Sequence, residues 1–357
     1  MEKIIKTQSG LKVGILTFHD GINHGAFIQA YSLYKYLEAK GCNVKIINYR
    51  PLMDYFNEFK VLMRRGRFSL KILVLKKIIT LWNYQKLFNK TPYSSKIEKL
   101  NTKDFDIVIL GSDEIWNLNS KTNIENFTYF GAGIESKKII SYAASFGSYK
   151  FHNPFPSKIP LLIDRLSRIS VRDYNSKEIL KKITKKKIDV VLDPAFFLPN
   201  FPMEKIFDKN FVAIYGWCGK KELEKLREHK VMMKKTFVSL SYYNKHADKN
   251  LINICPFKWL SRIFHADFVI TSTFHGVVIA ILYHKQFIVL KNDKITKIKT
   301  ILDILGLKDR IVDGIELINE KLDNKINYQN VQKKLEAEKK SSTLFLDNIL
   351  NEQIENF

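Results

Sequence analysis

The chain has 357 residues, 45% of them hydrophobic, and its 59 Lys and Arg against 36 Asp and Glu give a formal net charge of +23. This length favours two domains over one core, and the apolar fraction is ordinary for a soluble globular protein, which excludes a disordered chain. The positive charge predicts an anionic partner: nucleic acid, an acidic membrane surface, or a phosphorylated or acidic substrate. A codon bias that favours lysine would account for part of this positive charge.

Other composition features exclude further classes. The cysteines Cys42, Cys218 and Cys255 are far apart and form no C-x-x-C pair, so neither a disulfide framework nor a structural zinc site is indicated. Residues 1–12 lack the apolar core of a signal peptide. The longest apolar run, residues 268–283, is interrupted by polar residues and is too short to span a bilayer. We therefore expect a cytoplasmic protein.

The N-terminal half begins with a strand (residues 12–17), a loop (18–25), a helix closed by Gly41 and a second strand (44–49). This order predicts a parallel sheet with crossover helices. The loop has no G-x-G-x-x-G fingerprint, so we do not expect NAD.

Ligands of parallel sheets bind at the carboxyl ends of the strands, where this loop would lie. We therefore expect Asp20, Asn23 and Gly25 to contact a substrate. The alternative is an ordinary turn between a strand and a helix.

A strongly basic segment follows between Lys60 and Lys90, with nine Lys or Arg, no acidic residue and many apolar residues. A basic amphipathic helix pair of this kind can lie on an anionic membrane surface. The alternative is a packed helical insertion, over residues 55–95, with a solvated basic face.

Polar residues follow each of the next predicted strands. Asp113 and Glu114 come after the strand 105–110, and either is a candidate to accept a hydroxyl proton, although a helix N-cap would explain one of them. Arg172 follows the strand 169–171 and would grip a carboxylate or phosphate with two parallel bonds. The alternative role of Arg172 is an ion pair with Asp173 or Asp193.

A second alternation of strands and helices begins after residues 200–202. Its buried strand 268–271 turns sharply into an apolar helix that Ser272 or Thr273 would cap. Free amides and the positive end of the helix dipole make this turn a binding site for phosphate or carboxylate, and His275 would lie beside the bound anion. The alternative is a plain corner whose histidine bonds to backbone.

Together these patterns predict an α/β protein of two domains with the ligand cleft between them. Residues 1–200 would form the first domain and residues 201–310 the second. Residues 311–357 would add a helical segment that docks on a domain.

Six stretches, in order, resemble the polysaccharide pyruvyl transferase family. They are G-I-L-T-F-H-D-G-I-N-H-G-A-F-I-Q-A-Y-S-L (14–33), G-S-D-E-I-W-N (111–117), Y-A-A-S-F-G (142–147), S-V-R-D (170–173), L-D-P (192–194) and T-S-T-F-H-G (271–276). The resemblance implies a fold like that of the GT-B glycosyltransferases, with two Rossmann-like domains facing across a cleft. We then expect the first domain, with Asp20, Asn23 and Gly25, on the acceptor side and the second domain on the donor side. It also implies transfer of the enolpyruvyl skeleton of phosphoenolpyruvate to a sugar, usually as a cyclic ketal, with release of phosphate.

The resemblance implies that Arg172 and His275 contact phosphoenolpyruvate and that Phe274 offers its backbone. We add Thr273 and Gly276 of the same turn to the donor site. Glu114 departs from the Gln that similar sequences often carry. The acceptor would be a sugar of a bacterial surface polysaccharide or its lipid-linked precursor.

The chemistry agrees with these residue types. Phosphoenolpyruvate is a trianion that needs cationic and amide donors, and adding an alcohol at its C2 needs a general acid and then a base. We expect His275 to be the acid or a donor clamp, and Asp113 or Glu114 the base. No cofactor or metal is required.

Three rival functions remain open. The first is a glycosyltransferase that uses a nucleotide sugar on the same architecture. The second is a non-catalytic glycan-binding or membrane-binding relative. A nucleic-acid binder is the third, and it lacks a recognisable reader motif, so we expect no nucleic-acid partner.

Overall fold

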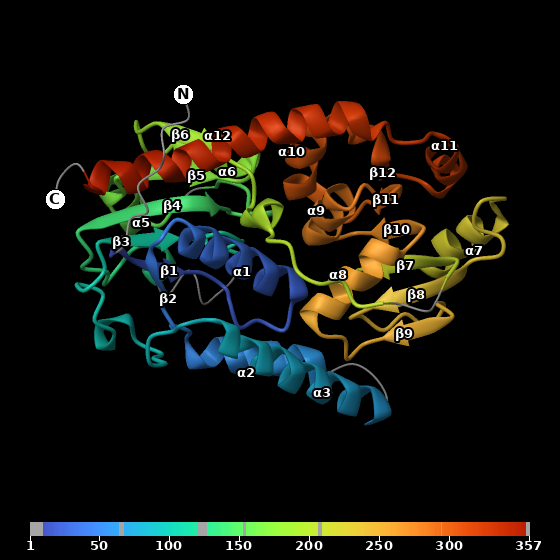
Figure 1. Ribbon diagram of the computed structural model, residues 1–357, viewed down its shortest axis with the longest axis horizontal. Coiled ribbons are helices and arrows are strands. Elements are labelled where there is room, and N and C mark those ends of the chain that lie inside the picture. Colours follow the sequence, from blue (N-terminus) through green and yellow to red (C-terminus); the bar gives the residue numbers. More distant parts are fainter. Residues whose placement is uncertain are drawn as a thin grey trace.

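The computed structural model describes residues 10–63, 68–119, 127–152, 155–205, 209–293 and 295–354. They form two domains that lie side by side, each built on a six-stranded parallel sheet (Figure 1). This is the α/β arrangement that the strand and helix order predicts.

The first sheet has the strand order β2-β1-β3-β4-β5-β6. Its strands are β1 (Lys12–Leu16), β2 (Asn43–Ile46), β3 (Ile107–Leu110), β4 (Lys138–Ala144), β5 (Arg168–Val171) and β6 (Ile188–Val190). The order reverses between β1 and β3, so the loops after these two strands flank a crevice at the carboxyl edge.

Helices α1 (His24–Ala39), α5 (Lys158–Arg165) and α6 (Tyr174–Lys181) belong to the first domain. Helix α1 begins where the Asn23 side chain accepts a hydrogen bond from the Gly25 amide, which satisfies one of the free donors of its first turn. Short 3₁₀ turns complete the loops: η1 (Gln85–Leu87), η2 (Ile97–Lys99), η3 (Phe127–Phe130) and η4 (Pro194–Phe197).

The second sheet has the order β12-β11-β10-β7-β8-β9, which reverses between β7 and β10. Its strands are β7 (Phe211–Tyr215), β8 (Thr236–Leu240), β9 (Lys249–Leu251), β10 (Phe268–Thr271), β11 (Phe287–Leu290) and β12 (Ile311–Val312). Its helices are α7 (Lys220–Glu228), α8 (Pro256–His265), α9 (Phe274–Leu282), α10 (Ile295–Leu305) and α11 (Ile318–Asp323), with the 3₁₀ turns η5 (Lys308–Arg310) and η6 (Ile315–Leu317).

Helices α2 (Leu52–Met63) and α3 (Phe68–Tyr84) are inserted between β2 and β3 and run along the lower side of the molecule in Figure 1. Helix α3 reaches the second domain: Lys77 Nζ donates to the Ser241 carbonyl at 3.1 Å, and Thr80 Oγ1 donates to Asn253 Oδ1 at 2.7 Å. The basic residues Arg64, Arg65 and Arg67 of this segment lie outside the described residues.

One apolar core runs through the boundary between the domains. It joins Phe27 and Leu33 of α1 to Trp259 and Leu260 of α8 and to Val277 of α9, all of them buried. Domains joined by a large apolar interface move little relative to one another, so this core fixes the two sheet edges that carry the site.

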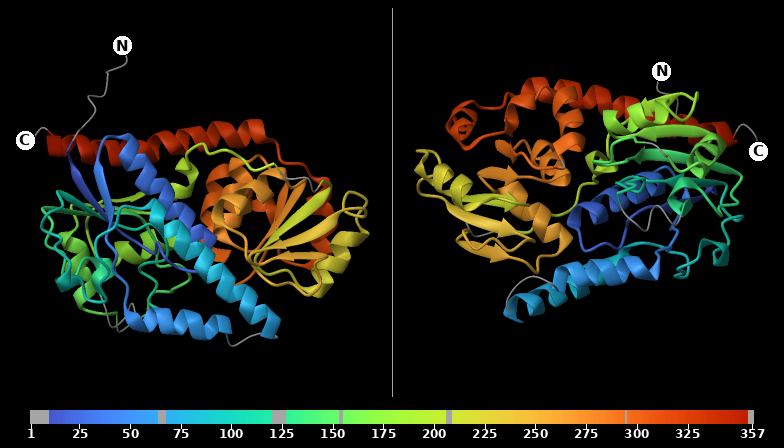
Figure 2. Two further views of the ribbon diagram at one scale, coloured as in Figure 1. Left: turned by 60° about the horizontal axis from the view of Figure 1, so that its bottom comes forward. Right: turned by 180° about the vertical axis from the view of Figure 1, so that it is seen from behind.

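Helix α12 (Tyr328–Ile354) crosses from the second domain to the first (Figure 2). Its first half is tied to the second domain by the Tyr328 hydroxyl, which donates to the Lys285 carbonyl. Its second half is tied to α1, where Tyr36 and Lys40 both donate to Asp347, at 2.7 and 2.8 Å. Among the described helices, none is long and apolar enough to cross a membrane.

Because α12 spans both domains, its buried face should carry much of the stability of the whole chain. Leu346 is buried, whereas Leu344 on the same helix is 55% exposed. We expect Leu346→Ala to lower the free energy of unfolding by about 2–5 kcal/mol through lost burial and a cavity, and Leu344→Ala to change it by less than about 0.5 kcal/mol. Urea unfolding of both variants measures this, and an equal loss would show that α12 packs differently.

Candidate functional site

The carboxyl ends of the two sheets meet at the domain boundary. From the first domain come the loops after β3, β5 and β6, and from the second comes the first turn of α9. Their side chains form a buried polar cluster, which consists of Asp113, Arg172, Asp193, Phe274 and His275.

Arg172 is the centre of this cluster and is almost fully buried. Its Nη1 donates to Asp193 Oδ2 at 2.6 Å, and its Nη2 donates to Asp113 Oδ1 at 2.9 Å. The guanidinium carbon lies 4.5 Å from the centroid of the Phe274 ring, a cation–π contact across the domain boundary. Within the described chain, Arg172 Nε has no hydrogen-bond partner.

Asp193 joins Arg172 to the second domain. It accepts hydrogen bonds from Ser112 Oγ and from the Ala195 amide, each at 2.9 Å, and its Oδ1 lies 3.7 Å from His275 Nε2. Burial alone would raise the pKa of Asp193, but its contacts with His275 and Arg172 outweigh burial and lower it. Asp193 therefore stays ionised, and the ion pair that was the alternative role of Arg172 is present.

Asp173, the other candidate partner of Arg172, has a different role. It caps α6 by accepting from the Ser176 amide at 2.8 Å, and it also accepts from Ser145 Oγ at 2.5 Å.

The turn into α9 is built as its sequence predicts. Thr273 is the N-cap, and its hydroxyl accepts from the Gly276 amide at 3.1 Å. Ser272 instead accepts from the Trp217 amide at 2.6 Å, which joins the loops after β7 and β10. The 3.7 Å contact of His275 with Asp193 is too long for a hydrogen bond, and His275 Nε2 has no other partner among the residues described.

Gly25 lies against His275, not against the crevice of the first sheet. Gly25 is buried, and a Cβ at this position would overlap the imidazole ring of His275. Any larger residue would push α1 and α9 apart, so the glycine permits the close approach of the two domains at the site.

Glu114 forms a second link between the domains. Its carboxylate pairs with Lys297 of α10 and accepts from Asn117 Nδ2 at 2.9 Å. Burial would raise the pKa of Glu114, but Lys297, Arg172 and Asn117 together lower it to about 2. A carboxylate held in this way is a weak base.

The crevice at the first sheet's reversal point contains a cavity of about 290 Å³. Its lining includes Asp20, Asn23, Arg50, Glu58 and Asp113. Arg50 donates to Asp20 at 3.1 Å and to Glu58 at 2.5 Å, so α2 supplies one wall of the cavity. Two of the three expected acceptor residues line it, and Asp113 connects it to Arg172.

The sequence did not single out His24, the residue before Gly25. Its Nε2 donates to the Ile254 carbonyl at 2.7 Å, so its Nδ1 accepts from Ser241 Oγ at 3.0 Å. Burial, together with the charge of Lys77, lowers the pKa of His24 to about 3 and keeps it neutral. Through these two hydrogen bonds His24 connects the first domain to the second.

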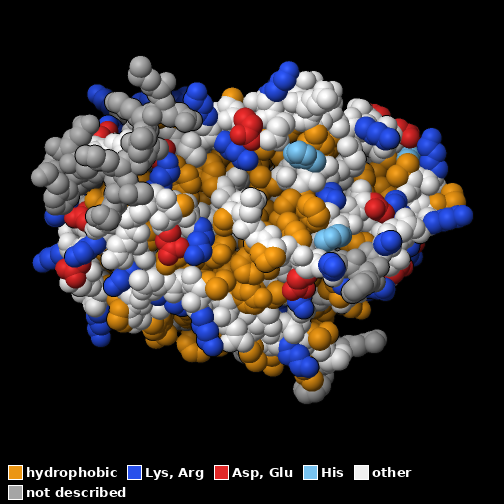
Figure 3. All heavy atoms as spheres, in the orientation of Figure 1, with side chains coloured by type: hydrophobic (Ala, Val, Ile, Leu, Met, Phe, Trp, Pro, Cys, Tyr) orange, Lys and Arg blue, Asp and Glu red, His pale blue; other side chains and the backbone are white. Residues whose placement is uncertain are grey.

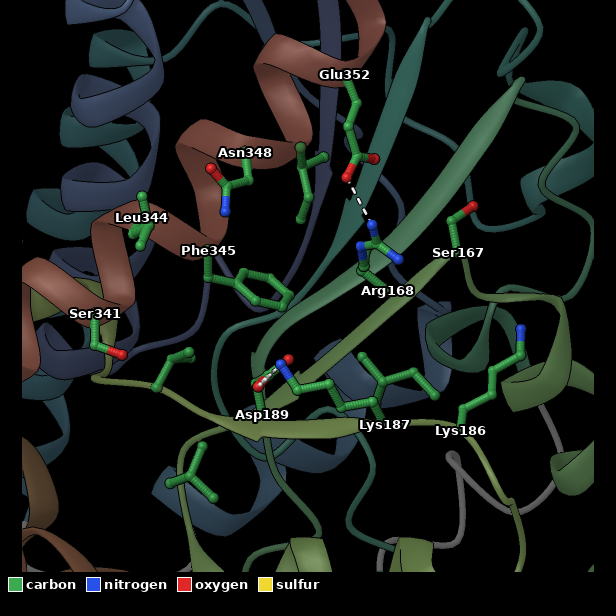
Figure 4. A pocket seen from close by; sticks show the side chains of 14 residues that line it. Ser167, Arg168, Lys186, Lys187, Asp189, Ser341, Leu344, Phe345, Asn348 and Glu352 are labelled. Carbon is green, nitrogen blue, oxygen red and sulfur yellow. Dashed lines mark hydrogen bonds and ion pairs between the residues drawn. The ribbon is translucent and has the colours of Figure 1, made fainter.

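A larger cavity, of about 600 Å³, lies away from this cluster, between α12 and the strands β5 and β6 (Figure 4). Its three cations already have partners: Arg168 pairs with Glu352 at 2.6 Å, Lys187 pairs with Asp189 at 3.0 Å, and Lys186 Nζ donates to the Leu166 carbonyl at 2.7 Å. It is therefore a poor site for an anionic donor. Within the described ranges, no group of three His, Cys, Asp or Glu is arranged to hold a metal ion.

The sequence profile of the polysaccharide pyruvyl transferase family matches residues 23–294, most of the chain and all of the polar cluster. The chain belongs to this family. It is therefore a transferase, and the resemblance seen in its motifs is confirmed. No curated protein matches the chain.

Solved structures similar to this pyruvyl transferase family member share its fold. MnaA of S. aureus, solved with UDP, aligns with a TM-score of 0.50 at 14% identity over 91% of this chain and 86% of its own. A putative UDP-N-acetylglucosamine 2-epimerase from Listeria monocytogenes gives 0.49 at 13%, over 92% and 91%. MurG of Acinetobacter baumannii gives 0.44 at 12%, over 96% and 100%. At these identities the likeness concerns the fold alone, and the likeness to MnaA together with the two six-stranded parallel sheets confirms the expected GT-B arrangement.

The Glu114–Lys297 link predicts an acid-sensitive domain boundary. Since the pKa of Glu114 is lowered from 4.5 to about 2, its contribution is full above about pH 4.5 and is lost as the pH falls toward 2. We expect Glu114→Gln to cost about 1–3 kcal/mol of unfolding free energy at pH 7 and progressively less below pH ~4.5.

Urea unfolding between neutral and acid pH measures this difference. Glu178→Gln is the matched control, because Glu178 forms an exposed pair with Lys181 that should contribute only about 0–1 kcal/mol. A Glu114→Gln penalty that is the same at every pH would contradict the assignment.

Proposed function

We propose that the protein transfers the pyruvyl group of phosphoenolpyruvate to a sugar of a bacterial surface polysaccharide or of its lipid-linked precursor, forming a ketal and releasing phosphate. The observation that carries this proposal is the contact chain from Arg172 through Asp193 to His275. It joins the two side chains that the family resemblance assigns to the donor, although they are 103 positions apart in the sequence.

Donor binding requires a change at Arg172, because two carboxylates already occupy its guanidinium. Asp193 is held by Ser112 and Ala195 and its side chain is 0% exposed, whereas the Asp113 side chain is 12% exposed and borders the cavity. Asp113 is therefore the carboxylate that gives way to the phosphate or carboxylate of the donor. The first turn of α9 supplies backbone amides and a positive dipole end for the same anion.

The reaction then needs two proton transfers that these residues can make. His275, whose Nε2 lacks a hydrogen-bond partner among the described residues, gives a proton to the methylene carbon and makes C2 electrophilic. Asp113, freed from Arg172, accepts the proton of the first sugar hydroxyl as its oxygen bonds to C2. A second hydroxyl then replaces the phosphate at C2, and its proton leaves with the phosphate.

Of the two carboxylates considered as the base, Asp113 fits better than Glu114. Asp113 lines the cavity, whereas Glu114 is paired with Lys297, which lowers its pKa to about 2. The cavity is also lined by Asp20 and Asn23, whose oxygen and amide groups suit sugar hydroxyls. The acceptor therefore enters beside α2, on the side of Asp113 away from His275.

The donor assignment predicts which variants stop phosphate release. With phosphoenolpyruvate and a lipid-linked oligosaccharide, Arg172→Lys and His275→Asn should each lower kcat/KM by at least about 100-fold, because a bidentate cation or a proton donor is lost. Arg168→Lys is the control, since Arg168 begins the same strand but is exposed and far from the cluster.

Two outcomes would overturn the proposal. One is phosphate release that is equal in Arg172→Lys and in the wild type. The other is release of a nucleoside diphosphate from a nucleotide sugar with none from phosphoenolpyruvate, which would make the protein a glycosyltransferase.

The acceptor cavity predicts a separate effect on the second substrate. Asp20→Asn should raise the acceptor KM about 10-fold and leave the donor KM unchanged, because only the cavity loses a charged acceptor of hydrogen bonds. Steady-state kinetics with each substrate varied in turn measures the two constants. An equal rise of both, or a rise of the donor KM alone, would place the sugar elsewhere.

A further inference from the structure

The outer side of α3 carries an apolar stripe that is exposed in the part of the chain that the structure describes. Ile72, Leu75, Ile79 and Trp82 follow one another at steps of three, four and three residues, so they share one helical face. Their side chains are 38% to 56% exposed. A contiguous apolar stripe on an exposed surface marks an interaction site.

Lysines flank this stripe and are free to meet an anion. Lys71 and Lys76 lie on α3 and Lys86 on the turn η1 that follows it. In the part of the chain that the structure describes, none of the three has an ion-pair partner.

Helix α2 adds a second apolar patch with a lysine. Leu52, Met53 and Phe56 are 55% to 67% exposed, and Lys60, one turn beyond Phe56, is exposed as well. The lower edge of the molecule in Figure 3, where Figure 1 places α2 and α3, shows apolar side chains with basic ones between them.

The opposite faces of both helices are fixed to the domains. On α3, Lys77, Ile78 and Leu81 are buried, and Gln85, which follows the helix, donates to the His19 carbonyl at 2.8 Å. On α2, Glu58 accepts from the Ile22 amide at 2.8 Å beside the acceptor cavity. The insertion is thus well anchored, and its outward apolar face is not the result of poor packing.

We propose that α2 and α3 form a docking surface for an anionic lipid bilayer, with Ile72, Leu75, Ile79 and Trp82 entering the headgroup region. Apolar residues with a tryptophan, flanked by lysines, are typical of helices that lie in the membrane interface. A second copy of the chain is a poorer occupant, because a symmetric contact would bring Lys71, Lys76 and Lys86 of both copies together.

This surface bears on the site, because α2 is both part of the docking surface and a wall of the acceptor cavity. A bilayer bound there would hold a lipid-linked sugar beside Asp20 and Asn23. That consequence rests on the proposed function, whereas lipid binding itself does not.

Co-sedimentation of the full chain with vesicles tests the proposal. The protein should bind vesicles of phosphatidylcholine with phosphatidylglycerol, bind those of phosphatidylcholine alone much more weakly, and be released in part by high salt. Ile79→Ser/Trp82→Ser should lower the partition coefficient at least about tenfold, since it removes two apolar side chains from the lipid contact. Leu344→Ser, an equally exposed change on α12, should leave it unchanged.

A spectroscopic measurement locates the contact. Because Trp116 and Trp259 are buried, Trp217→Phe leaves Trp82 as the exposed tryptophan, and its emission should shift to the blue on anionic vesicles. Absence of binding, equal binding to neutral vesicles, or unchanged binding by the double variant would overturn the proposal. So would a dimer, seen by sedimentation velocity without lipid, that the double variant abolishes.

The two proposals fail separately. Vesicle binding without phosphate release from phosphoenolpyruvate would remove the proposed function alone. Pyruvyl transfer to a short water-soluble acceptor by a protein that ignores vesicles would remove the lipid surface alone.

Discussion

The organisation of the site depends on compensating the buried charge of Arg172. A guanidinium taken out of water must be paired, and removing one partner of such a buried pair costs about 3–5 kcal/mol. Asp113 and Asp193 supply the compensation from two other strand ends, so one cation holds the tips of β3, β5 and β6 together. The same cation packs against Phe274, which brings α9 into the cluster. Arg172 and Phe274, two of the residues that we propose to contact the donor, therefore also connect the two domains.

The apolar core between the domains limits how this state can open. Because α1 packs directly on α8 and α9, a wide hinge motion would expose buried side chains such as Phe27, Trp259 and Val277. A rearrangement of the loop after β3 alone would expose less buried apolar surface. It would break the ion pair of Asp113 with Arg172 and loosen that of Glu114 with Lys297. Asp113 and Glu114 lie in one loop after β3. A single movement of this loop would therefore free the guanidinium of Arg172 and also free Asp113, which we propose as the base.

Much of this could be predicted from the sequence, because strand ends and caps are set by local residues. The corner from β10 into α9, with Thr273 as its cap, follows from a buried strand, a hydroxyl and an apolar helix in succession. The partners of individual side chains could not be predicted. Glu114 and Lys297 are 183 positions apart, and Gly25 meets His275 only because α1 and α9 cross. The central place of Asp193 was visible only as a carboxylate at a strand end, one of several. For residues 60–90 Lys77 is packed inward and an apolar stripe lies outward, and the contact with a membrane stays a prediction.

The two opposite faces of helix α2 have different surroundings. Its inner face carries Tyr55, whose hydroxyl donates to Asp20, and Glu58, which holds Arg50. Its outer face carries Leu52, Met53 and Phe56. A helix moves as a unit, so a shift of the outer face on a surface would change the positions of Tyr55 and Glu58 and, through them, the carboxylate of Asp20. If the proposed bilayer contact shifts α2, the shape of the cavity proposed for the acceptor would change without any movement of the domains.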